Sequence, residues 1–203
     1  MGIREKIFAW ANAKAVNRIN CIYDDYKTKI FSGLSGTILE IGPGPGTNLP
    51  YFTSKIKYIA VEPNIYMHSH LKEKAKKFGI KINIIKGNSE NLPLKDKSVD
   101  VVISTLVLCS VSDLAASLKE IERVLKPKGK LIFIEHVAST KPSLRKIQNF
   151  FNPAWRWLAL GCNLNRETWL ELKKAGFKLE YSYLDMNVGF PLVKPHIIGI
   201  ATL

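Results

Sequence analysis

The stretch "ILEIGPGPGTNLPYF", residues 38–52, decides the fold class. An apolar run ends in Glu40, and glycines follow at every second position, Gly42, Gly44 and Gly46. Glycine permits positive φ angles and lets a ligand approach the backbone closely. A buried strand that runs into such a turn is typical of nucleotide-binding α/β proteins. The stretch therefore predicts a nucleotide-binding loop at the end of a first strand.

The residues between the glycines indicate which nucleotide binds. A phosphate-binding P-loop is excluded because no Gly-Lys-Ser/Thr follows, and the dinucleotide fingerprint needs glycine where Thr47 stands. The pattern E-x-G-x-G-x-G instead resembles motif I of class I S-adenosylmethionine methyltransferases. Pro43 and Pro45 stiffen the loop and remove two backbone donors that a pyrophosphate would use. Glu40 can serve the ammonium group of S-adenosylmethionine, directly or through water.

Apolar runs alternate with helical stretches along the rest of the chain, which favours a mostly parallel sheet covered on both faces. This pattern predicts a single α/β domain with a Rossmann-like, seven-stranded methyltransferase sheet. We expect a helix at 112–129 that begins at Ser112 or Asp113, and another at 166–176 capped by Asn165. The expected strands span residues 37–42, 58–63, 82–87, 99–105, 130–137, 178–185 and 196–203, with a further helix at 66–79.

Polar residues after the second and third expected strands complete the cofactor prediction. Glu62, followed by Pro63, lies about twenty residues beyond the loop, where an acid accepts both ribose hydroxyls. The resemblance implies that Asn88 and Ser89 read the adenine edge, although aspartate is commoner at the first of these positions. Thr105 and Leu106 follow strand four, beside the expected position of the transferred methyl group.

Four stretches narrow the resemblance: "DVVISTLVLCSV", "VLKPKGKLIFIEHVA", "NPAWRWLALGCNLNRETW" and "VKPHIIGIA". They look like the methyltransferase-like protein 7 group, whose mammalian members are alkyl-thiol S-methyltransferases on internal membranes and lipid droplets. The resemblance implies methyl transfer to a small lipophilic acceptor, first of all a thiol. An O-, N- or C-methyltransferase of a quinone, lipid or other metabolite is the alternative within enzymes. A non-catalytic cofactor-binding or membrane-surface module is the alternative of another class.

The acceptor side is expected from the fifth strand onward. His136 stands at the carboxyl edge of the sheet, where it could act as a base or stabilise a thiolate, or bond structurally to Glu135. We expect no metal ion, because methyl transfer from a sulfonium needs none. The expected substrate pocket consists of Cys109, Trp155, Trp157, Trp169 and His196. The alternatives are core packing for the tryptophans, a structural role for His196, and packing of Cys109 as a small apolar residue against the cofactor.

The segment 1–35 stands apart from the expected methyltransferase domain at 36–203, whose helix-rich substrate-side insert spans about 139–176. Apolar residues at i, i+4 spacing predict one or two amphipathic helices, which pack on the domain, cover the pocket as a lid or contact a surface. The residues of this stripe are Ile3, Ile7, Ala11, Ala15, Ile19 and Tyr23.

Composition limits the partners. The chain has 203 residues and a net charge of +13, but its lysines are scattered, so nucleic acid is not expected. A weak peripheral contact with an anionic membrane is favoured over nucleic acid, and a lysine-rich genome composition is the alternative explanation of the charge. Three distant cysteines argue against a disulfide framework and a zinc site, and for a reducing compartment. Without a recognisable secretory signal or apolar span, the expected location is cytoplasmic or peripheral to a membrane. The sequence indicates no protein partner.

Overall fold

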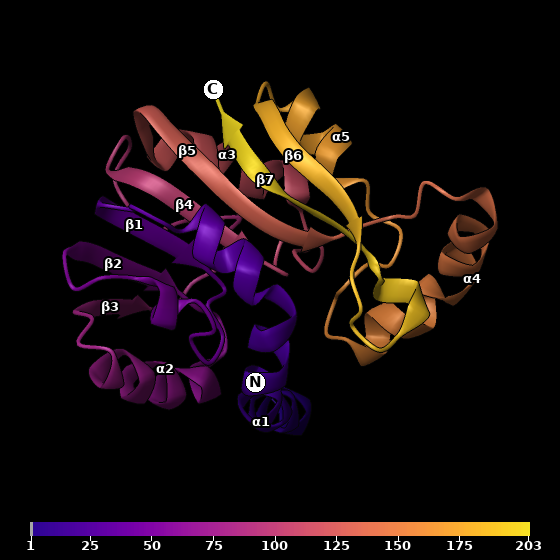
Figure 1. The fold of residues 1–203 in the computed structure, drawn as a ribbon, viewed down its shortest axis with the longest axis horizontal. Coiled ribbons are helices and arrows are strands. Elements are labelled where there is room, and N and C mark those ends of the chain that lie inside the picture. The colour runs from indigo at the N-terminus through magenta and orange to yellow at the C-terminus, as the bar shows by residue number, and fades with distance from the viewer. Residues whose placement is uncertain (1) are drawn as a thin grey trace.

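A mixed sheet lies at the centre of the structure, a computed structural model that describes residues 2–203 except for the side chains of 12, 13 and 15–20. Within that range the sheet has seven strands in the order β3-β2-β1-β4-β5-β7-β6 (Figure 1). The first five in this order pair in parallel, and β7 runs antiparallel to both β5 and β6. The strands are β1 (Gly36–Ile41), β2 (Ile56–Val61), β3 (Ile82–Ile85), β4 (Val99–Thr105), β5 (Leu125–His136), β6 (Lys178–Asp185) and β7 (Pro195–Thr202). This arrangement confirms the predicted fold class.

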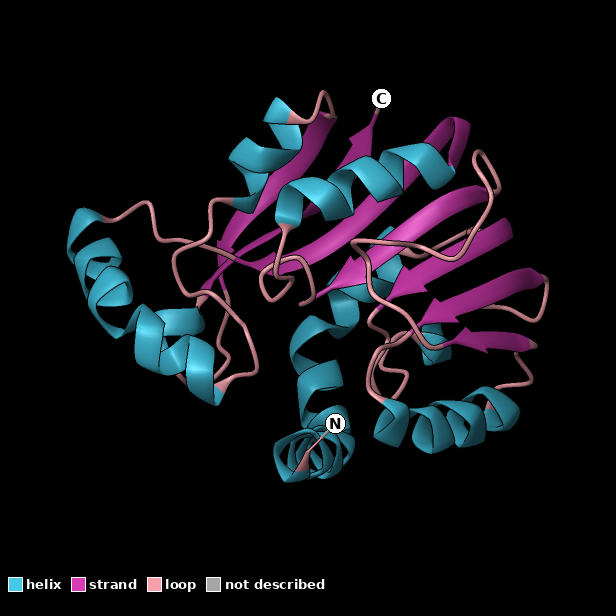
Figure 2. Ribbon diagram, turned by 180° about the vertical axis from the view of Figure 1, so that it is seen from behind, coloured by secondary structure: helices cyan, strands magenta, loops and turns pink. Residues whose placement is uncertain are grey.

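Helices cover both faces of the sheet (Figure 2). Helices α1 (Ile3–Ile30) and α2 (Ile65–Lys77) pack on one face, and α3 (Leu114–Val124) and α5 (Thr168–Lys174) on the other. Because both faces are covered, the central strands are apolar along their length. The core on the first face includes Tyr23, Phe31, Leu71, Ile38 and Ile103, and the core on the second includes Leu118, Ile121, Leu172, Leu39 and Val102.

Local signals explain several helix ends. Asp113 caps α3, as expected, because its Oδ1 accepts a hydrogen bond from the Ala116 amide at 3.0 Å. The expected Asn165 cap of α5 is wrong: Glu167 precedes the first turn, and the Asn165 carbonyl accepts from Arg145. Helix α3 also ends earlier than expected, because residues 125–129 already belong to β5.

The N-terminal segment is one long helix with two different surroundings. Tyr23 is buried in the core, whereas Ile3 and Ile7 are 78% and 60% exposed. The side chains of Ala15 and Ile19 lie outside the described residues. The expected i, i+4 stripe is therefore not a continuous buried face: the second half of α1 packs on the sheet, and its first turns extend past the sheet edge (Figure 1).

Helix α4 (Pro142–Leu158) lies beyond the end of the sheet (Figures 1 and 2). Gln148 is its one buried side chain, and the helix packs on the short 3-10 helix η2 (Pro191–Val193). Its apolar residues Phe150, Trp157 and Leu158 are largely exposed. Helix α4 is thus an amphipathic element held at the carboxyl edge of the sheet, where open α/β sheets bind their ligands.

Candidate active site

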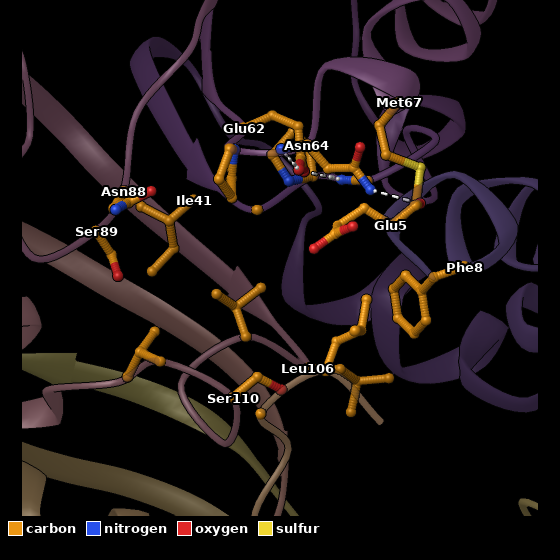
Figure 3. A pocket seen from close by; sticks show the side chains of 18 of the residues that line it. Glu5, Phe8, Ile41, Glu62, Asn64, Met67, Asn88, Ser89, Leu106 and Ser110 are labelled. Carbon is orange, nitrogen blue, oxygen red and sulfur yellow. Dashed lines mark hydrogen bonds between the residues drawn. The ribbon is translucent and has the colours of Figure 1, made fainter. Parts of the chain in front are cut away.

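A cavity of about 640 Å³ opens at the carboxyl ends of β1, β2 and β4, a size that suits a small-molecule ligand. Four turns that follow strands line one side of it, at residues 42–45, 62–64, 88–90 and 105–107. The opposite side comes from the first turns of α1 and the end of α4. Figure 3 shows Glu62, Asn88 and Ser89 across the cavity from Phe8.

The glycine loop places its backbone against the cavity. Gly42 and Gly44 have φ angles of +54° and +55°, in the left-handed region that favours glycine. A Cβ at Gly42 would lie 2.7 Å from Val107 Cγ2, so packing against Val107 also requires glycine at position 42. A Cβ at Gly44 would meet no protein atom within 4 Å, and Gly44 lines the cavity. Gly46 lies behind the loop instead, near Leu49.

Glu62 joins the end of β2 to the glycine loop. Its two carboxylate oxygens accept hydrogen bonds from the amides of Gly44 at 2.9 Å and Asn64 at 2.8 Å. Burial raises the pKa of Glu62, and the two amide bonds favour its charged form. Each oxygen keeps a second lone pair, so the carboxylate can still accept ribose hydroxyls from within the cavity. Pro63 lies beside it in the same wall.

The adenine side of the expected cofactor site lies at the turn after β3. Asn88 is exposed and lines the cavity, so its amide is accessible to a ligand. Ser89 also lines the cavity, but its hydroxyl is already held by Ser117 Oγ at 2.9 Å. Ile41 provides an apolar wall beside them, whereas Met67 lies on the other side of the cavity, next to Glu5 (Figure 3).

Glu40 lies behind the cavity rather than in its wall. It is fully buried, accepts a hydrogen bond from the Tyr58 hydroxyl, and receives one from Asn48 Nδ2 at 2.9 Å. Burial raises its pKa to about 7. Asn48 Nδ2 also donates to Thr105 Oγ1 at 2.9 Å, and Thr105 lines the cavity. Glu40 is therefore linked to the cavity through Asn48, whose buried Oδ1 has no hydrogen-bond partner among the described residues.

A strained turn after β4 forms the floor. Leu106 has a φ angle of +58°, which costs about 1–2 kcal/mol for a residue with a side chain. Buried Glu135 holds this turn, because its carboxylate accepts from Ser104 Oγ at 2.6 Å and from the Val107 and Cys109 amides at 3.1 and 3.2 Å. Glu135 thus positions the floor, a role that its sequence position in an apolar strand does not reveal.

The first turns of α1 connect two sides of the cavity mouth. Asn64 Nδ2 donates to the Glu5 carbonyl at 3.0 Å, and the Arg4 guanidinium lies 4.6 Å from the centre of the Trp157 ring. Arg4 also donates a hydrogen bond to the Trp157 carbonyl. Residues at the start of α1 and the end of α4 therefore meet over the cavity. Nothing in the local sequence around Arg4, Glu5 or Phe8 signals this contact.

The predicted acceptor-side residues separate into two groups. Trp157 lines the cavity. Trp155 stacks on Phe190 at 5.2 Å, and Trp169 packs against Tyr183 in the second core. The residues that lie outside the cavity wall are Cys109, His136, Trp155, Trp169 and His196.

The two histidines face each other across β5 and β7, where His136 pairs with His196. His196 contacts the Tyr23 hydroxyl through Nε2 at 2.8 Å and the Lys194 carbonyl through Nδ1 at 2.9 Å. Burial lowers the pKa of His196 to about 4, so it is neutral and structural. The Nδ1 atom of His136 lies 3.5 Å from Cys162 Sγ rather than against Glu135.

This arrangement fits S-adenosylmethionine better than a dinucleotide. The loop approaches the ligand at one open glycine, Gly44, and offers few amides because prolines stand on either side of it. Glu62 can bind a ribose, and the wall beyond Leu106 is apolar where a methyl group would be transferred.

Comparison with known proteins agrees with this geometry. Residues 39–133 match a family model described as a methyltransferase domain. The chain is 37% identical over 178 residues to human thiol S-methyltransferase TMT1A, covering 84% of this chain and 73% of that protein. It is 33% identical over 211 residues to human thiol S-methyltransferase TMT1B, covering 96% and 85%.

Solved structures show the same fold at lower sequence identity. A putative S-adenosyl-L-methionine-dependent methyltransferase from Methanococcus maripaludis has a TM-score of 0.68 at 21% identity, covering 100% of this chain and 94% of that one. An Aquifex aeolicus methyltransferase has a TM-score of 0.65 at 21% identity, covering 93% and 97%. The chain is an S-adenosylmethionine-dependent methyltransferase that acts on a small molecule, and it belongs to the family of the thiol S-methyltransferases TMT1A and TMT1B.

Proposed function

We propose that the enzyme transfers the methyl group of S-adenosylmethionine to the sulfur of a small lipophilic thiol. The observation that carries this proposal is the apolar character of one end of the cavity. We call this end the acceptor half, made of Phe8, Leu106, Val107, Val111, Trp157 and Leu160. The cofactor half is made of residues 42–45, 62–64, 88 and 89. The names of the human relatives support sulfur as the acceptor atom.

The reaction is an in-line displacement at carbon. The acceptor thiolate forms a bond to the methyl carbon while the bond from that carbon to the donor sulfonium breaks, and S-adenosylhomocysteine leaves with the electron pair. Alignment of the two reactants can lower the barrier by about 7–11 kcal/mol. The strained turn at Leu106, held by Glu135, is the part of this site whose rigidity favours such alignment.

The acceptor must lose its proton before it attacks. A cysteine-like thiol has a pKa of about 8.5, so only a few per cent is ionised at neutral pH. Arg4, Arg156 and the acid Glu5 all line the outer wall of the cavity, so the two guanidinium groups leave a net positive charge there. We propose that their field favours the thiolate, while His136, which lies outside the cavity wall, does not touch the acceptor.

The acceptor assignment is tested by incubating the enzyme with labelled S-adenosylmethionine and a panel of alkyl thiols, phenols, amines and lipids. We expect label on the thiols, with higher kcat/KM for longer alkyl chains because the acceptor half is apolar. Label on a phenol, an amine or a quinone with the thiols unlabelled would contradict the proposal. Cofactor binding without turnover of any compound would favour the non-catalytic alternative.

We also propose that the enzyme works at the cytoplasmic surface of an anionic membrane. The first turns of α1 expose Ile3 and Trp10, and α4 exposes Phe150 at its middle and Leu158 at the end that meets α1 over the cavity. The net charge of +13 favours an anionic surface. No helix among the described residues is long and apolar enough to cross a bilayer. Residues 1–35 would then act as both a lid and a surface contact for a domain at 36–203.

Vesicle sedimentation tests this second proposal. We expect the full chain to sediment with vesicles that contain phosphatidylserine and to remain in solution with neutral vesicles. Phe150→Ser should weaken sedimentation, whereas Phe78→Ser, a change at an exposed phenylalanine at the end of α2, should not. Equal sedimentation of both variants would contradict the assignment of this surface.

A further inference from the structure

Three residues that are far apart in sequence meet behind the acceptor half of the cavity. Cys109 lies in the loop after β4, His136 ends β5, and Cys162 follows α4. Cys162 Sγ is 3.8 Å from Cys109 Sγ and 3.5 Å from His136 Nδ1. The three atoms all lie within 4.8 Å of one another. Their sequence spacing resembles no zinc motif, so only the fold reveals the cluster.

Two of the three separations are those of ligands around one tetrahedral zinc ion. Zinc binds thiolate at about 2.3 Å and imidazole at about 2.0–2.1 Å. With tetrahedral angles these lengths place two sulfurs about 3.8 Å apart, and a sulfur and a nitrogen about 3.6 Å apart. The observed separations of 3.8 and 3.5 Å agree with both values. The third separation, between Cys109 Sγ and His136 Nδ1, is within 4.8 Å, so a zinc ion fits once these two side chains adjust toward each other.

The chemistry of the two thiols and the imidazole also favours zinc. Thiolate and imidazole are the ligand types that zinc selects over harder cations such as Mg²⁺ and Ca²⁺. The ring nitrogen that faces the cluster is His136 Nδ1, so binding of the metal there would leave the proton on Nε2.

We propose that Cys109, His136 and Cys162 form a zinc site that joins the substrate-side insert to the carboxyl edge of the sheet. The ligands come from three separate elements, and a residue adjacent in sequence to each cysteine, Ser110 and Gly161, lines the cavity. The two cysteine-bearing loops are already joined by a backbone hydrogen bond, in which the Asn163 amide donates to the Cys109 carbonyl at 2.9 Å. Zinc would fix the acceptor wall, and its fourth position is left for water or a small exogenous ligand.

Cobalt substitution tests the site in the full-length protein, reduced and freed of metal with a chelator. Tetrahedral Co²⁺ bound to thiolate gives a charge-transfer band in the near ultraviolet and strong visible absorption. We expect both signals to saturate at one Co²⁺ per chain and to disappear when Zn²⁺ is added. Cys162→Ser and His136→Gln should reduce the saturating signal at least severalfold.

The third cysteine provides the matched control. Cys21 is exposed on α1, outside the cluster, so Cys21→Ser should keep the full cobalt signal. Circular dichroism and calorimetric binding of S-adenosylhomocysteine establish that each variant is folded. We also expect Zn²⁺ to raise the melting temperature of the unmodified protein and Cys21→Ser, but not that of Cys162→Ser.

Two results would overturn the proposal. One is a folded, reduced protein that shows no charge-transfer band, or a band that Cys21→Ser lowers as much as Cys162→Ser does. The other is a reduced protein that binds no cobalt but loses two thiols in air to a bond between Cys109 and Cys162, which would identify a redox pair instead. Neither readout depends on which acceptor the enzyme methylates.

Discussion

The two halves of the cavity are built in different ways. The cofactor half consists of short turns, each directly after a parallel strand, so its residues are close to the sheet that holds them. The acceptor half combines the turn after β4 with the first turns of α1 and the end of α4, and these two helix segments reach the cavity from outside the sheet. Substitutions in the first half should therefore change cofactor affinity, whereas substitutions in the second should change acceptor kinetics.

The largest predicted effect is on the unfolding free energy and concerns Glu40, which is buried behind the cofactor half. Burial raises the pKa of Glu40 from 4.5 to about 7, so the folded state binds more protons than the unfolded state between these values. The stability associated with Glu40 is therefore present at low pH and falls as pH rises. Relative to Glu40→Gln, the unmodified protein should lose about 2–3 kcal/mol of unfolding free energy between pH 5 and 8.

Urea denaturation of both proteins across this pH range measures the difference. Tyr58→Phe removes one hydrogen bond to Glu40 but keeps the carboxyl group, so it should retain the pH dependence. Parallel pH profiles for the unmodified protein and Glu40→Gln would contradict the prediction.

The next effect concerns the open glycine of the cofactor half. Gly44→Ala places a methyl group in the cavity where the loop approaches the ligand, so the affinity for S-adenosylmethionine should fall about thirtyfold, or about 2 kcal/mol. Isothermal titration calorimetry measures this change. Gly79→Ala is the matched control, because Gly79 has a similar φ angle of +66° and open space around it but ends α2 outside the cavity. Equal affinities of the two variants for S-adenosylmethionine would show that Gly44 does not contact the ligand.

A change in the acceptor half should have a smaller and different effect. Trp157→Ala removes an apolar wall, so KM for a lipophilic thiol should rise about tenfold while the affinity for S-adenosylmethionine stays constant. Trp10→Ala is the control, because Trp10 is 59% exposed and lies outside the cavity wall. A loss of cofactor affinity in Trp157→Ala would contradict the division into two halves.

The smallest effect concerns the contact between the two helices that form the outer wall. Arg4 over the Trp157 ring is an exposed cation–π pair, worth about 0.5–1 kcal/mol. Arg4→Gln should therefore speed the release of the methylated thiol about two- to fivefold in stopped-flow measurements and leave the affinity for S-adenosylmethionine unchanged. Lys6→Gln, a change at a neighbouring exposed cation outside the wall, should leave the rate unchanged.

The same division explains what could be predicted from sequence. The parallel strands were predictable because strands covered on both faces are apolar throughout, and Gly44, Glu62 and Asn88 follow such strands within three residues. Phe8 was not predictable, because its place in the wall depends on how α1 crosses the sheet edge. His136 was correctly expected at the carboxyl edge, but a position in sequence does not specify on which side of a neighbouring loop the side chain lies.

Second-layer residues were missed for a related reason. Asn48 and Glu135 hold the cavity floor through hydrogen bonds to residues far away in sequence. Asn48 stands directly after the glycine loop, which is a weak signal for a role there, whereas Glu135 gives only the general hint of an acid inside an apolar strand. The three residues of the proposed zinc site were the hardest to predict from sequence, because each comes from a different element.

The alternation of proline and glycine in the first loop also has a consequence for the entropy of binding. The glycines at 42 and 44 add freedom to the unfolded chain, and Pro43 and Pro45 restrict it at the positions in between. Both prolines are buried, so the loop is also confined by its neighbours in the folded protein. Little conformational freedom is then left to lose when the cofactor arrives, and more of the contact energy is available as affinity.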